Sequence, residues 1–178
     1  MTSIGEIGLI GLVISDLQEL HSWCGETHIQ KTAYVAKATR HVPFKSEFVL
    51  YKHRPYSFDM SNALLQMRAQ KIITATPQGG YGSSFSLNDS IWPAVRRAAE
   101  PTLEAHGEKI RFVCSKFARK KVAELERIAT AIYVHYNFGD LVPSQQHAKL
   151  NELKPHISIP EARVAFEDAR VFLEPARS

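Results

Sequence analysis

The sequence contains very little cysteine. Cys24 and Cys114 are the two cysteines among 178 residues, and neither belongs to a CxxC pair. Zinc ribbons and thioredoxin-like redox sites need closely spaced cysteines, and a disulfide framework needs several of them. The sequence therefore excludes these classes and is typical of a protein from a reducing compartment.

Long apolar runs are also lacking. The N-terminal stretch "IGEIGLIGLVISDLQEL" is interrupted by Glu6 and Asp16, and it has neither a basic leader nor a small-residue cleavage site. No segment reaches the roughly 18 uninterrupted apolar residues that a membrane-spanning helix requires. We therefore expect a cytoplasmic protein.

The composition is that of an ordinary globular protein with a moderately basic balance. Apolar residues make up 44% and charged residues 22%, and the formal net charge is +4. A chain of this length can bury a core as one domain, or as one small domain with a helical extension. The charge favours anionic partners, although many moderately basic proteins bind nothing charged.

Apolar spacing predicts two helices and a strand in the first third of the chain. Residues 4–20 carry apolar side chains at intervals of three and four, although Gly5, Gly8 and Gly11 weaken the first turns of this helix. A second helix is expected from an N-cap at Thr27 to near Val42, because a proline follows. The β-branched and aromatic residues of 46–54 predict a strand.

A short helix followed by a glycine-rich hairpin is the most informative pattern. Ser57 is a suitable N-cap for a helix over 58–71, and a strand, a loop and a strand should follow over 72–87. Glycines at 79, 80 and 82 permit unusual φ angles in the turn. The apolar side of the helix contains Met60, Ala63, Leu64 and Met67, and the polar side contains Asp59, Asn62, Gln66 and Gln70.

The second half of the chain is predicted to be helical. We expect a helix over 91–107 that breaks at Pro101 and ends at Gly107, a long helix over 108–136, and two further helices over 145–154 and 159–174. The predicted fold class is therefore α/β (α+β) and mostly helical. It comprises a winged-helix-like domain over 1–105 and a helical extension over 106–178 that packs on the same core.

The helix over 58–71 has the features of a DNA-reading helix. Asn62 and Gln66 lie one turn apart, and their amides can pair bidentately with adenine, with Arg68 also near the bases. The hairpin would act as a wing through Gln78 and Tyr81. An ordinary amphipathic surface helix beside a solvent-exposed hairpin remains an alternative, because the hairpin tip contains no Lys or Arg.

Basic side chains are concentrated between residues 31 and 54. If they share one surface, they form an electrostatic footprint for phosphates. We expect Lys31, Lys52, Arg54 and, from the next helix, Lys71 to lie near phosphates. A second group, at 109–121, surrounds its helix too widely to form one stripe and is interpreted mainly as a solvated face. The first group consists of Lys31, Lys37, Arg40, Lys45, Lys52 and Arg54.

Two short motifs that could suggest chemistry are weak. The segment "HSWCGETH" brings His21, Cys24 and His28 together, but its spacing matches no zinc pattern and no second cysteine lies nearby. The segment "GGYGSS" lacks the lysine of a phosphate-binding loop and does not precede a helix. We therefore expect no catalytic residue, no metal and no cofactor.

Three segments resemble a known family. The stretches "IQKTAYVAK" at 29–37, "FVLYKHRPYS" at 48–57 and "AQKIIT" at 69–74 resemble the pattern of Panacea-type (SocA-like) antitoxin domains and the related YwgA-like proteins. The resemblance covers roughly residues 4–90, and 152–173 look like the YwgA-like helical tail. One departure is Arg54, where the family usually has glycine. The motif positions are Gln30, Lys31, Tyr34, Tyr51, Pro55, Tyr56 and Ser57.

The resemblance implies a winged-helix-like core with a helical C-terminal part, no established enzyme activity, and genes near toxin–antitoxin or phage-defence systems. Together with the residues above, it favours a small DNA-binding transcriptional regulator that dimerises through its C-terminal helices. One alternative is an antitoxin or defence-complex subunit that binds a protein encoded nearby. Another is an RNA-binding protein that stacks bases on Tyr56 or Tyr81. An enzyme is the hypothesis with least support.

Overall fold

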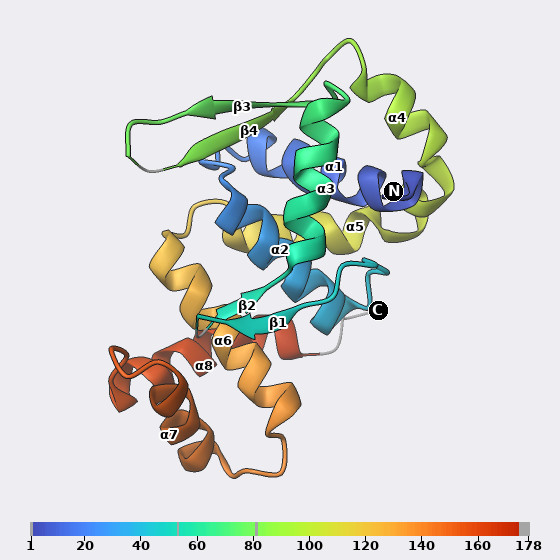
Figure 1. Cartoon of the computed structure of the whole chain (residues 1–178). Coiled ribbons are helices and arrows are strands. Elements are labelled where there is room, and N and C mark those ends of the chain that lie inside the picture. The colour runs from blue at the N-terminus through green and yellow to red at the C-terminus, as the bar shows by residue number, and fades with distance from the viewer. Residues whose placement is uncertain (1, 53, 81, 175–178) are drawn as a thin grey trace.

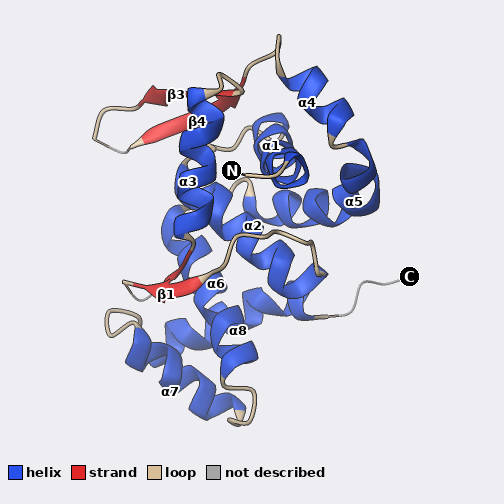
Figure 2. Ribbon diagram, turned by 45° about the vertical axis from the view of Figure 1, so that its right-hand side comes forward, coloured by secondary structure: helices blue, strands red, loops and turns tan. Residues whose placement is uncertain are grey.

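The computed structural model describes residues 2–52, 54–80 and 82–174, which form eight helices and two antiparallel hairpins (Figures 1 and 2). This confirms a mostly helical α+β fold. The helices are α1 (Ile4–Glu19), α2 (Glu26–Arg40), α3 (Phe58–Ala69), α4 (Trp92–Ala98), α5 (Glu100–Phe117), α6 (Val122–Asn137), α7 (Pro143–Leu153) and α8 (Ile159–Leu173). The strands are β1 (Val49–Tyr51), β2 (Arg54–Tyr56), β3 (Ile73–Pro77) and β4 (Ser83–Leu87).

The two hairpins form separate sheets on either side of α3 in the chain. In the first, Val49 pairs with Tyr56, and in the second, Ile73 pairs with Leu87. The strand expected over 46–54 is confirmed only at Val49–Tyr51, because the chain reverses after Tyr51 and pairs with itself. Lys52 adopts a left-handed conformation there, with φ of 46°, which begins the reversal. The second hairpin was predicted correctly.

Helix α1 forms the centre of the core. It packs against α4, α5 and α2 (Figure 1), and nearly all of its side chains from residue 6 to residue 17 are buried. Its glycines permit this packing. A Cβ added to Gly8 would lie 2.3 Å from Ala99 Cβ, and a Cβ added to Gly11 would lie 2.2 Å from Trp92 Cζ3. These glycines therefore allow α4 and the start of α5 to approach the helix closely.

The boundaries of α4, α5 and α6 differ from those expected. The break at Pro101 is confirmed, since α5 begins at Glu100, but α5 continues through Gly107 to Phe117. The long helix over 108–136 was wrong, because a turn over 118–121 separates α5 from α6. Lys121 is extended there, with ψ of 154°. The turn contains no glycine or proline, so local sequence gave no indication of it.

The C-terminal helices agree closely with expectation. Helices α7 and α8 cover the predicted segments, and Pro160 lies in the first turn of α8 behind a Ser158 cap. Helix α5 runs across the boundary predicted between residues 105 and 106, and one buried cluster includes side chains from every helix except α4, whose partly buried Val95 packs against it. Among the helices of the described residues, none is long and apolar enough to cross a membrane.

The close packing at α1 predicts opposite effects for two glycine substitutions. Gly11→Ala should lower the free energy of unfolding by roughly 1–3 kcal/mol, because the methyl group would overlap the Trp92 ring. Gly5→Ala is the matched control. Its Cβ would first meet Thr102 Oγ1 at 3.4 Å, so helix propensity should leave stability unchanged or raise it by up to about 1 kcal/mol. Urea unfolding measures both, and equal effects would contradict this packing.

Candidate nucleic-acid interface

Helix α3 is anchored at its N-terminus and along its apolar side. The Ser57 side chain accepts a hydrogen bond from Met60 N at 3.2 Å, which confirms the predicted cap. The expected apolar side, formed by Met60, Ala63, Leu64 and Met67, is buried. The opposite side of the helix faces solvent, so α3 has the two-sided character that a reading helix needs.

A buried amide on α2 fixes the start of α3. Gln30 Oε1 accepts a hydrogen bond from Ser57 N at 2.8 Å, and Gln30 Nε2 donates to Ser57 O at 3.0 Å. The same Nε2 lies 3.0 Å from Ser61 Oγ and 3.2 Å from Glu26 Oε1. Gln30 is 1% exposed, so these bonds replace the water that its carboxamide would otherwise bind. Sequence reasoning named Gln30 as a motif position without finding this role.

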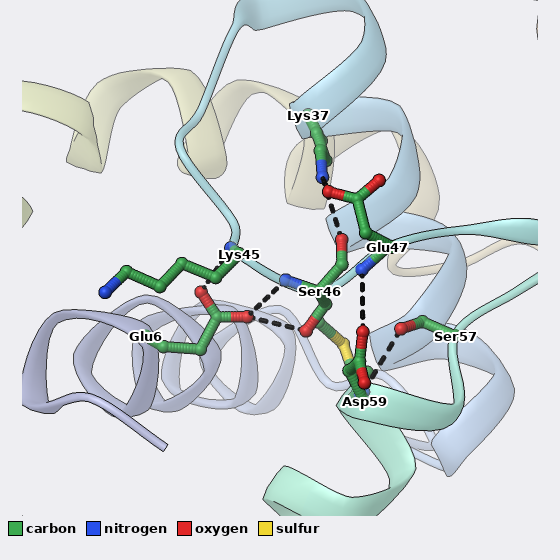
Figure 3. A network of polar contacts seen from close by, with 8 residues as sticks. Glu6, Lys37, Lys45, Ser46, Glu47, Ser57 and Asp59 are labelled. Atoms are coloured by element: carbon green, nitrogen blue, oxygen red, sulfur yellow. Dashed lines mark hydrogen bonds and ion pairs between the residues drawn. The ribbon is translucent and has the colours of Figure 1, made fainter. Parts of the chain in front are cut away.

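The loop before β1 is held against α1 and α3 by carboxylates (Figure 3). The buried Glu6 carboxylate accepts hydrogen bonds from Lys45 N at 2.7 Å and from Ser46 N and Oγ at 3.1 and 2.6 Å. Asp59, in the first turn of α3, accepts a hydrogen bond from Glu47 N at 3.1 Å. These contacts fix the loop to the base of α3. They also occupy Asp59, which the sequence had placed on the solvent-facing polar row.

The basic group at 31–54 does not form one exposed surface. Lys37 pairs with Glu47 at 2.9 Å, and Arg40 donates to Phe172 O at 2.7 Å at the end of α8. Arg54 pairs with Glu126 at 2.6 Å. Lys45 and Lys52 remain exposed. Most of this positive charge therefore serves contacts within the molecule.

Lys31 is the clearest correction. Sequence reasoning expected its ammonium near a phosphate, but the residue is 1% exposed and Nζ donates to the buried Pro55 carbonyl oxygen. Burial lowers the pKa of Lys31 to about 8, an effect that the nearby negative charge of Glu126 only partly offsets. A side chain in this position cannot contact a ligand outside the protein.

Lys31 belongs to an ionic cluster that joins α2, β2, α6 and the end of α7. Glu126 Oε1 accepts from Arg54, and Glu126 Oε2 lies 3.6 Å from the Lys154 ammonium. Burial acts to raise the pKa of Glu126, but the Arg54 hydrogen bond and the charge of Lys154 outweigh it and hold that pKa low. Burial also lowers the pKa of Lys154. One carboxylate thus neutralises part of three positive charges.

Five of the nine predicted contact residues lie on the surface and are free to meet a ligand. Asn62 and Arg68 are exposed on α3, and the backbone of Lys71 follows the helix in a left-handed conformation with φ of 59°. Gln66 is half-buried, and its Oε1 accepts from Thr2 N and Oγ1 at 3.1 and 2.8 Å, so that acceptor is already used. Tyr81 lies outside the described residues. The five are Lys52, Asn62, Arg68, Lys71 and Gln78.

Two observations argue against a reactive thiol or a metal site in the "HSWCGETH" segment. Burial raises the pKa of Cys24 to about 12, so its thiol is protonated at neutral pH. Within residues 2–52, 54–80 and 82–174, no group of three His, Cys, Asp or Glu side chains is placed to hold a metal ion. Cys24 Sγ lies 3.9 Å from Ile14 O, in the core.

Replacing the buried lysine should change how stability depends on pH. The Lys31 pKa is about 8 in the folded protein and 10.5 when unperturbed. Between these values the unfolded chain binds the proton and the folded chain does not, so this group should raise wild-type stability with pH, by on the order of 3 kcal/mol. Lys31→Met should lose this rise, and the exposed-site variant Lys109→Met should keep it.

Urea unfolding at a series of pH values measures the difference between wild type and each variant. Subtracting the curves removes the opposing effect of the buried thiols, whose raised pKa values lower stability once the unfolded thiols ionise above about pH 9. A Lys31→Met curve parallel to the wild-type curve would show that Lys31 titrates normally.

No family model matches the chain, and a search of the curated proteins finds no match. The resemblance to Panacea-type domains therefore rests on the motif residues quoted above.

Proposed function

We propose that the protein is a small DNA-binding transcriptional regulator of winged-helix type, with α3 as its reading helix and the β3–β4 hairpin as its wing. The observation that carries the proposal is the rigid connection of a solvent-facing helix to the hairpin that follows it. Asn88, just beyond β4, donates from N to Ile72 O at 2.9 Å and from Nδ2 to Lys71 O at 3.0 Å. These bonds tie both ends of the hairpin to the end of α3.

The exposed side chains of this unit suit duplex DNA. Asn62 can pair with the edge of adenine, and Arg68, six residues later, can pair with guanine or with a phosphate. Lys71 follows at the helix end, and Lys52 lies at the tip of the other hairpin. Both hairpins extend to the same side of the molecule in Figures 1 and 2. The unit therefore offers base contacts flanked by phosphate contacts.

The regulator is further proposed to be a homodimer that joins through α8. Val164 and Val171 lie two turns apart on this helix and are exposed, as is Ile159 at its start. A dimer would place two copies of α3 on successive half-sites of a palindromic operator. The link to toxin–antitoxin or phage-defence systems is part of the same proposal and rests on the motif resemblance.

A second candidate function, a protein-binding antitoxin or defence-complex subunit, is favoured by one observation. The outward side of α3 also carries Phe58 and Leu65, which are 52% and 58% exposed. The Phe58 ring contacts the exposed ring of Tyr51 at a centroid distance of 5.1 Å. Exposed apolar side chains of this size more often meet a protein than a nucleic acid. Loss of co-purification with a neighbour-encoded protein in a Leu65→Asp variant, without duplex binding by wild type, would favour this candidate.

Substitutions on α3 and directly after it should separate base contacts from phosphate contacts. After selection of a duplex from a random library, filter binding over a salt series should give wild-type affinity that falls steeply with salt. Lys71→Ala should reduce the slope of log K against log salt by about 1. Asn62→Ala should cost about 1–3 kcal/mol at one base pair and leave the slope unchanged.

Lys109→Ala, at an exposed lysine on α5, is the matched charge control and should behave as wild type. The proposal is abandoned if no duplex is enriched, or if wild-type binding is insensitive to salt.

A further inference from the structure

A pocket of about 690 Å³ lies beside α2, and no residue of α3 lines it. It is formed by the segment that precedes α2 and by the turn between α5 and α6. No acidic residue lines it. The side chains that define its chemistry are His21, Trp23, His28, Arg119, Lys120 and Lys121.

The segment before α2 holds an indole ring at the edge of this pocket. Trp23 is 39% exposed, and its ring lies against Gly25 so closely that a Cβ there would be 2.2 Å from Trp23 Nε1. Gly25 in turn bridges to Ser84 of β4. Both Cys24 and His21 have left-handed φ values, of 50° and 58°. The left-handed His21 ends α1 in the usual helix C-cap, in which Ser22 N donates to Leu17 O at 2.9 Å.

The opposite wall of the pocket is positively charged and fixed by a buried histidine. His28 Nε2 lies 3.1 Å from Lys120 O, and because a carbonyl only accepts, Nε2 carries the proton. His28 Nδ1 is then an acceptor, and it has no partner among the described side chains and backbone. This contact sets the α5–α6 turn. The sequence gave no sign of it, because His28 and Lys120 are 92 residues apart.

The charges of this wall are largely unneutralised. Lys120 approaches Glu124 at 3.9 Å, whereas Arg119 and Lys121 form no ion pair within the described part of the chain and are exposed. Helix α6 begins directly after Lys121, and the Glu124 carboxylate in its first turn accepts a hydrogen bond from Lys121 N at 2.9 Å, so this helix end is already partly neutralised and the side chains of Arg119 and Lys121 supply the free positive charge. An anionic group would therefore be attracted to the wall of the pocket that Arg119 and Lys121 form.

We propose that this pocket binds a nucleotide, with the base stacked on Trp23 and the phosphate held by Arg119 and Lys121. An aromatic face next to positive charge is the arrangement that recognises a base joined to a phosphate. The volume lies within the range of pockets for small ligands. The nucleotide has two sources with this chemistry, a free mononucleotide and one unit of a single strand. The site shares no side chain with the proposed α3 interface.

Calorimetric titration with adenosine monophosphate and anisotropy with a labelled ten-nucleotide deoxyadenylate strand test the proposal. Wild type should bind at least one of the two. Trp23→Ala should weaken that binding by about tenfold or more, because stacking on an aromatic ring contributes on that scale. Trp23→Phe should retain most of the affinity. Arg119→Ala with Lys121→Ala should weaken binding and reduce its salt dependence.

The matched control is Arg96→Ala with Arg97→Ala, which removes two exposed cations on α4 that do not line the pocket. Binding of the mononucleotide identifies a free ligand, and binding of the strand alone identifies a single-stranded nucleic acid.

The proposal is overturned if neither probe binds at millimolar concentration, or if the Arg119 and Lys121 double variant binds as wild type. Because these two residues are exposed, their variant should fold even if Trp23→Ala does not. Duplex binding by α3 variants is measured separately, so either proposal can fail alone.

Discussion

The pairing of the Gln30 carboxamide with both backbone groups of Ser57 is the contact on which the arrangement of α3 depends. One buried side chain on α2 satisfies the N–H and the carbonyl of the residue that caps α3. Leaving either backbone group unpaired in the core would cost on the order of 1–3 kcal/mol. The direction of α3, and therefore of every side chain on its outward face, follows from this contact and from the packing of Met60, Ala63, Leu64 and Met67.

Buried charged side chains also hold β2, the strand that leads into α3. Lys31, one residue after Gln30, donates to Pro55 O. Glu126 on α6 forms ion pairs with Arg54 and Lys154. The first hairpin is thus held between α2 and α6. Burying charge is costly unless it is paired and hydrogen-bonded. This arrangement explains why two residues expected at the surface, Lys31 and Arg54, have internal partners.

Local sequence was sufficient where an element depends on its own residues. The Ser57 cap, the apolar side of α3, the glycine-rich hairpin and the proline at the start of α8 all follow from short-range rules. The turn between α5 and α6 could not be found in this way, because it depends on a contact between His28 and a carbonyl far away in the chain. The same applies to Gly8 and Gly11, which appeared to weaken a helix and instead admit its neighbours.

Part of the candidate interface was also predictable. The exposure of Asn62 follows from helical periodicity, which places it opposite the buried side chains of Met60, Ala63 and Met67. Periodicity cannot show that Gln66 bonds to Thr2 or that Lys31 is buried, since both depend on partners distant in sequence. The residues that line the pocket beside Trp23 come from two distant segments of the sequence, one near residue 23 and one near residue 120. Neither segment indicates a site by itself.

Hydrogen–deuterium exchange, followed by mass spectrometry with and without a selected duplex, would test most directly whether α3 and its hairpin form the DNA-contacting unit. We expect added protection at 58–71 and at the 73–87 hairpin, with little change in α7. Protection confined to the C-terminal helices, with the backbone of α3 unaffected, would contradict it.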